Sequence, residues 1–121
     1  MSIFPACFAA VALLLAAHGS SFAAETIRQL DGAQIRSKLS GMELSDGVHS
    51  RDVFGRDGVL TSHAMGKKTA GKWRVRGDEL CLTRPKEDES CYVVWAAGTK
   101  LELRRKGTDL PLLEGTLARP R

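Results

Sequence analysis

Residues 71–95, which read GKWRVRGDELCLTRPKEDESCYVVW, constrain the fold of this chain more than any other stretch. Apolar and polar residues alternate through it, a Gly77-Asp78 pair interrupts the alternation, and a cysteine stands on each side of a charged loop. Alternation with a period of two predicts strands that bury one face, and such a pair is typical of a tight hairpin turn. The stretch therefore predicts consecutive antiparallel strands, with a disulfide between Cys81 and Cys91 across the second hairpin.

Tight turns also fix which residues of neighbouring strands face each other. A two-residue turn at 77–78 pairs Val75 with Leu80, the bridge sets Leu80 beside Tyr92, and a turn at 98–99 continues the same phase. The predicted core face collects Trp73, Val75, Leu80, Leu82, Tyr92, Val94, Ala96, Leu101 and Leu103. The opposite face collects Arg74, Arg76, Cys81, Thr83, Cys91, Val93, Trp95, Glu102 and Arg104.

Turn signals recur at intervals of about ten residues from position 46 to position 109, which is typical of an antiparallel meander. A short helix precedes them at about 32–40, with Asp31 as its N-cap, Gln34 completing a capping box and Gly41 as its stop. The predicted fold class is mostly β: an antiparallel meander of seven or eight short strands forming a small barrel or sandwich, with one short N-terminal helix.

The N-terminus has the features of a secretory signal peptide. Residues 4–17 are almost entirely apolar, too few to span a bilayer, and small residues follow them. We expect residues 1–23 to be the signal peptide, with cleavage after Ala23 or Ala24, and residues 24–121 to be a single small β domain. An uncleaved membrane anchor is the alternative. Export would place the protein in the periplasm or outside the cell, where a disulfide is stable.

The charge balance argues against a nucleic-acid partner. Lys and Arg number 18 against 14 Asp and Glu, a formal charge of +4, which is far from the density of a nucleic-acid binder. We therefore expect no nucleic-acid partner and, once the signal peptide is cleaved, no membrane span.

Within residues 50–95 the pattern F-x-x-D-G, G-x-W, L-C and C resembles that of small exported bacterial proteins with a lipocalin-like meander domain. Phe54, the 57–58 turn, Trp73 and the two mature cysteines carry this pattern. The resemblance implies a fold and a compartment, and it implies no catalytic or binding residue because the matched positions are structural.

No residue set predicts catalysis, a cofactor or a metal. A two-residue turn at 57–58 would place Ser50 opposite His63 and leave His49 on the other face, which conflicts with a shared metal site. Asp52 and Asp57, close to them, are expected to serve turn geometry. The serines lie beside turns or on alternating strands, outside any nucleophile-elbow pattern, and the mature cysteines are expected to be bridged.

A candidate surface patch lies on the predicted outer face, where basic residues surround two apolar side chains. It consists of Arg74, Arg76, Val93, Trp95 and Arg104. A solvated sheet face is the plain interpretation of the basic residues. Because Val93 and Trp95 would not be left together in water, we expect the helix to dock on them through Ile35 and Leu39. Otherwise the patch is open and binds a partner.

The function expected from these features is a non-enzymatic binding module of the cell envelope, whose partner is an envelope protein or a small anionic ligand. Its core looks filled by Trp73, Tyr92 and the leucines, which favours binding on the surface. The alternative is an exported inhibitor of a hydrolase that presents the bridged hairpin loop at 86–89. A small hydrolase is a third and weaker alternative.

Overall fold

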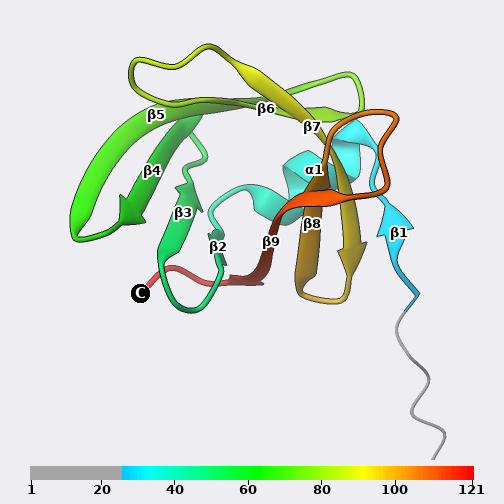
Figure 1. The fold of residues 1–121 in the computed structure, drawn as a ribbon, viewed down its shortest axis with the longest axis horizontal. Helices are drawn as coiled ribbons and strands as arrows, with labels where there is room; N and C mark the ends of the chain where they lie inside the picture. The colour runs from blue at the N-terminus through cyan, green and yellow to red at the C-terminus, as the bar shows by residue number, and fades with distance from the viewer. Residues whose placement is uncertain (1–25) are drawn as a thin grey trace, which may run out of the picture.

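The computed structural model describes residues 26–121 (Figure 1). The expected signal peptide at 1–23, and its cleavage after Ala23 or Ala24, lie outside the described residues.

The described residues form one antiparallel barrel with one helix. The elements are β1 Arg28–Gln29, α1 Gly32–Leu39, β2 Glu43–Ser45, β3 Ser50–Phe54, β4 Val59–Ala64, β5 Lys67–Arg76, β6 Glu79–Thr83, β7 Ser90–Ala97, β8 Lys100–Arg104 and β9 Pro111–Ala118. From β2 to β9 each strand pairs with the next, and β9 pairs with β2, so these eight strands close into a barrel. The two-residue β1 is an additional strand on β7. The mostly-β prediction is confirmed, and of the two predicted arrangements the structure has the barrel.

The predicted strand register is confirmed around the disulfide. Val75 pairs with Leu80, Leu80 with Tyr92, and Val94 with Leu103. These residues point into the barrel, and the predicted core residues are buried there, with Val75 and Tyr92 partly buried. A short turn leaves little choice of pairing, so local sequence was sufficient here.

The register predicted for β3 and β4 is wrong by one residue. Phe54 pairs with Leu60 and Ser50 with Ala64. The connecting turn is longer than two residues: the N–H of Gly55 donates to the carbonyl of Val59, and the N–H of Gly58 donates to that of Gly55. The carboxylate of Asp57 fixes this turn by accepting from the N–H of Val59 at 3.0 Å.

The barrel interior is filled with apolar side chains. The rings of Phe54 and Trp73 meet edge to face with centroids 5.5 Å apart, and the indole N–H of Trp73 donates to the carbonyl of Gly55 at 2.8 Å. The other buried members of this core are Ile35, Leu39, Leu44, Leu60, Leu80, Leu82, Val94, Ala96, Leu101, Leu103 and Leu117.

The helix lies across one end of the barrel, behind β8 and β9 in the view of Figure 1. Its Ile35 and Leu39 are fully buried in the barrel core, and it packs against β5 and β6. The prediction that it docks on Val93 and Trp95 is therefore wrong. At its first residue, Gly32, the N–H donates to the carboxylate of Asp78 at 2.8 Å, which ties the helix to the β5–β6 turn. At the barrel end, Ile35 and Leu39 join the main hydrophobic core, which removes their apolar surface from water.

The meander divides its connections between two ends. The turns at 55–58 and 77–78 lie at the end covered by α1, which we call the helix end. The loops at 46–49, 65–66, 84–89 and 105–110 lie at the opposite end, which we call the loop end.

Candidate functional site

The predicted surface patch lies on one outer face, as expected, but its apolar part is covered by the chain itself. Val93 is 9% exposed and Trp95 is partly buried. Gln29 of β1 pairs with Trp95, and the guanidinium of Arg104 lies 4.6 Å from the centroid of the indole ring. Glu102 holds Arg104 there by accepting from its Nε at 3.0 Å. These contacts account for Val93 and Trp95 on an outer face without a docked helix.

Arg74 and Arg76 lie on the same face of β5, where Arg74 forms an ion pair with Glu89. Its Nε and Nη2 donate to the two carboxylate oxygens of Glu89 at 2.8 and 2.6 Å. This pair raises the pKa of Arg74 and lowers the pKa of Glu89. The prediction of a disulfide across the hairpin is confirmed, because the sulfur atoms of Cys81 and Cys91 are bonded. The loop at 84–89 is thus fastened to β5 on its outer side.

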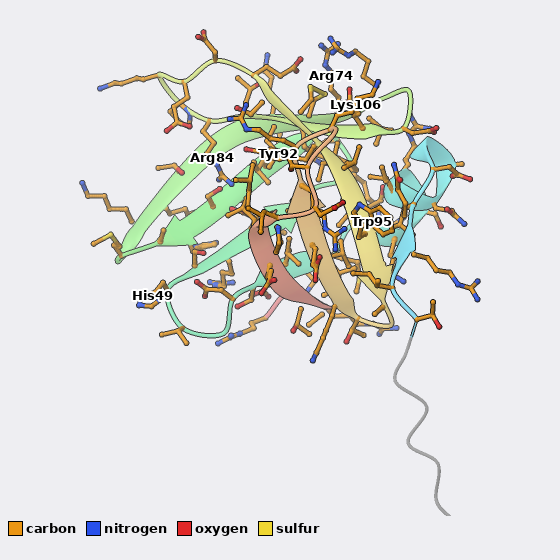
Figure 2. The ribbon with its side chains drawn as sticks, turned by 45° about the vertical axis from the view of Figure 1, so that its right-hand side comes forward. His49, Arg74, Arg84, Tyr92, Trp95 and Lys106 are labelled. Atoms are coloured by element: carbon orange, nitrogen blue, oxygen red, sulfur yellow. A yellow bond between two sulfur atoms is a disulfide. The ribbon has the colours of Figure 1, made fainter. Side chains whose placement is uncertain are left out.

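An ion pair inside the barrel fastens the other end of the same loop. The guanidinium of Arg84 donates to both carboxylate oxygens of Asp52, at 3.2 and 3.0 Å, and to the hydroxyl of Ser62 at 2.8 Å. Ser62 in turn donates to Asp52 at 2.6 Å. Hydrogen bonding to Asp52 raises the pKa of Arg84, against the opposing effect of burial, and Tyr92 contributes further (Figure 2). The expectation that Asp52 serves turn geometry is wrong.

A close approach of two strands brings Arg84 inside. A Cβ atom at Gly71 would lie 2.2 Å from the carbonyl oxygen of Thr83, so only glycine lets the end of β6 cross β5 at this point. The sequence contains a signal for this cluster. Because Phe54 and Leu60 point inward, Asp52 and Ser62, two residues away on each strand, must point inward as well.

A pocket of about 330 Å³ at the helix end brings together three arginines from distant parts of the chain. Arg36 comes from α1, Arg56 from the β3–β4 turn and Arg74 from β5, and we call this the arginine pocket. Its other lining residues are Ser40, Asp57, Gly58, Trp73 and Val75. The side chain of Arg56 runs against Gly41, where a Cβ atom would lie 3.1 Å from its Nε. Among the ion pairs of residues 26–121, Arg74 pairs with Glu89, whereas Arg36 and Arg56 take part in none.

His49 and His63 lie at one site on the loop end, and the expectation that they occupy opposite faces is wrong. Both line the same two surface hollows. His63 pairs with Arg51 on the outer face, and His49 belongs to a loop that Asp46 shapes. The Oδ1 of Asp46 accepts from the N–H groups of Val48, His49 and Ser50 at 2.8–3.0 Å. These hydrogen bonds lower the pKa of Asp46 to about 2.

In the part of the chain that the structure describes, one group of three side chains stands close enough to share a metal ion: Cys81, Glu89 and Cys91. Both sulfurs of this group are already joined in the disulfide, so neither is a free thiolate ligand. The short distance between these groups reflects the bridged hairpin, and it does not indicate a metal centre.

Comparison with known proteins adds no functional assignment. No protein-family model, curated protein or solved structure matches the chain. Among residues 26–121, the helix falls short of the length and apolar character needed to cross a membrane. The function must therefore be argued from the geometry of the sites described above.

Proposed function

We propose that this domain is a non-enzymatic binding module of the cell envelope, periplasmic or secreted, and that it binds on the outside of its barrel. The apolar N-terminal run and the disulfide support an exported protein. The filled interior supports external binding, because α1 covers one end and the ion pair of Arg84 with Asp52 occupies the inside near the other. A small hydrolase has less support, since the hydroxyl of Ser62 is held between that same pair.

The observation that carries the proposal is the arginine pocket. Arg36 and Arg56 have no acidic partner among the described residues, so their guanidinium groups are free to bind an anion. Asp57, the one acidic lining residue, already accepts from the N–H of Val59. The lining thus fits a small anionic ligand that carries a carboxylate or phosphate group, which guanidinium groups bind in a planar, two-pronged geometry.

Titration of the mature protein with inorganic phosphate and pyrophosphate, followed by NMR of the arginine Nε–H groups, tests this site. We expect Arg36→Gln/Arg56→Gln to weaken binding by about tenfold or more, as for the loss of charge-assisted hydrogen bonds. Arg28→Gln/Arg105→Gln removes the same charge at exposed positions elsewhere and should leave the affinity within about twofold. Equal losses in both variants would mean that net charge alone attracts the anion, and the pocket would lose its role.

The second candidate function, inhibition of a hydrolase, is favoured by the anchored loop at 84–89. The disulfide holds its base, Arg84 fastens it inside the barrel, and Glu89 fastens it outside. Its residues from Pro85 to Asp88 are exposed. A loop that is already ordered loses little entropy on binding, which is what an inserting inhibitor loop requires.

Inhibition assays against a panel of envelope and secreted hydrolases test this candidate. Replacing Glu87 and Asp88 with glutamine should weaken inhibition of a susceptible enzyme, while Arg36→Gln/Arg56→Gln should not. The two proposals are thus separated by which pair of residues matters. Inhibition unaffected by the loop variant would exclude the loop as the inserting element.

A further inference from the structure

The two most exposed large hydrophobic residues of the described chain lie on neighbouring loops of the loop end. Met65, in the β4–β5 turn, is 92% exposed, and Val48, in the β2–β3 loop, is 80% exposed. Met65 also has a φ of 53°, a left-handed conformation that is uncommon for a residue with a side chain. Neither side chain belongs to the core cluster, so packing of the barrel does not explain them.

Surface hollows show that these two loops are adjacent. His49 and His63 line a hollow with Val48, and the same two histidines line a second hollow with Met65. Figure 1 shows the C-terminus between the β2–β3 loop and the β4–β5 turn, and Figure 2 shows His49 pointing away from the barrel. The two apolar side chains therefore stand at one corner of the molecule. We call this corner the tip patch, made of Val48, His49, His63, Met65, Lys67 and Lys68.

The apolar side chains of the tip patch are surrounded by basic groups. Lys67 and Lys68 follow Met65 after one glycine, are exposed, and take part in no ion pair of the described residues. The nearby carboxylate of Asp46 is occupied by three backbone N–H groups. Glu43 is buried and lies 3.9 Å from Arg51, so it does not neutralise the lysines.

We propose that the tip patch docks on an anionic lipid surface. Met65 and Val48 would enter the interface between headgroups and acyl chains, while Lys67 and Lys68 contact lipid phosphates. Lysine suits this position because its aliphatic stem can follow the apolar side chains and its ammonium can remain among the headgroups. A lipid surface fits better than a protein partner because both apolar residues stand on protruding loops, and a soft interface accommodates such loops without a matching pocket. This inference is independent of the arginine pocket, which lies at the other end of the barrel.

Vesicle sedimentation with the mature protein tests the proposal. Binding should be strong to vesicles in which about a third of the phosphatidylcholine is replaced by phosphatidylglycerol, and weak to phosphatidylcholine alone. Lys67→Gln/Lys68→Gln should lower the partition coefficient for the anionic vesicles by roughly 30-fold, because each lysine near an anionic lipid surface contributes a similar electrostatic attraction and two are lost. Met65→Ser/Val48→Ser should also lower it, by roughly tenfold or more.

Two matched controls separate the tip patch from general effects. Lys100→Gln/Lys106→Gln makes the same charge change at exposed positions outside the patch. Leu110→Ser removes an apolar side chain that is 77% exposed on a different loop. Neither control should change the partition coefficient by more than about twofold. Equal losses in the controls and the patch variants would overturn the proposal, and so would the absence of binding to anionic vesicles.

A fluorescence measurement checks insertion directly. Met65→Trp should show a blue shift and quenching by brominated lipid when anionic vesicles are added, whereas Leu110→Trp should show neither. Retention of the protein on immobilised polyglutamate, without vesicle binding, would assign the patch to an acidic macromolecule instead and overturn the lipid proposal.

Discussion

Arg84 and Asp52 form an ion pair inside the barrel, near its loop end. Two hydrogen bonds join them, and Ser62 satisfies a further donor and acceptor. Their side chains are 31% and 17% exposed, so water screens the pair only in part. A partly buried ion pair of this kind adds less to the free energy of unfolding than its short distances suggest, because burial removes water from both charges. Removing one member is costly, since the other charge then has no partner.

We expect Asp52→Ala to lower the free energy of unfolding by about 2 kcal/mol, because the Arg84 guanidinium is then left half-buried and unpaired. Arg84→Ala should cost less, and the double variant should recover part of the loss. Urea denaturation at neutral pH of the four proteins gives the coupling energy, which should exceed about 1 kcal/mol. Strict additivity of the two single variants would show that the pair does not act as a unit.

Trp95 shows how an apolar residue on an outer face can be covered without a docked helix. Its cover is the Arg104 guanidinium and the short strand β1. We therefore expect Trp95→Ala to lower the unfolding free energy by about 2 kcal/mol, below the 3–5 kcal/mol of a core tryptophan. A denaturant melt measures this change. A loss of about 4 kcal/mol or more would mean that Trp95 is as well packed as Trp73.

At the scale of elements, the hairpin of β6 and β7 is held by three contacts, one disulfide and two ion pairs. The disulfide joins the strands, Arg84 reaches inward, and Glu89 reaches outward to Arg74. Arg74 is 57% exposed, so this outer pair adds little stability by itself. Together the three contacts leave the loop between them few alternative conformations.

Reduction of the disulfide should lower the unfolding free energy by roughly 2–3 kcal/mol, because the loop that it closes contains about ten residues. The unfolded chain gains freedom, while Arg84 and Glu89 still hold the loop in the folded protein. Thermal melts with and without a phosphine reductant measure the difference, and Lys72→Gln serves as a control that should respond to reduction like the wild type. An unchanged melting temperature on reduction would contradict this estimate.

At the scale of the whole molecule, two groups of basic side chains without an ion pair among the described residues lie on separate surfaces: Arg36 with Arg56, and Lys67 with Lys68. The arginine pocket lies at the helix end, and the tip patch lies at the loop end. The two proposed binding surfaces can therefore act at the same time. A protein docked by its tip patch would present the arginine pocket on the side away from the lipid.

The loop of the tip patch that contains Asp46 should respond to acid. The folded-state pKa of Asp46 is about 2, against 3.8 for the unperturbed group, so its contribution to stability is present above pH 3.8. It is lost as the pH falls from 3.8 to about 2. Glu89, whose pKa is lowered by Arg74, contributes with the same sign. We expect stability to fall over this range in urea melts, and Asp46→Asn to reduce the fall. A variant with the wild-type acid profile would exclude Asp46 as a contributor.

The sequence alone determined those parts of the fold in which residues close together in the chain fix the strand pairing or the helix start. The two-residue turn at 77–78 and the alternation around it gave the correct register for three strands, and Asp31 with Gln34 gave the start of the helix. In these places the physical choice is local, since a tight turn or a cap allows few geometries.

The tertiary structure decided what depends on groups far apart in the sequence. Arg84 reaches Asp52 and Ser62 only because β6 crosses Gly71, and Arg36, Arg56 and Arg74 meet only because α1 packs across the barrel end. A one-residue shift in the β3–β4 turn was enough to move His63 to the site of His49, since each step along a strand reverses the face. The alternation of apolar and polar residues predicts which face of a strand a residue occupies. Which residues of other strands lie beside it on that face depends on how the barrel closes.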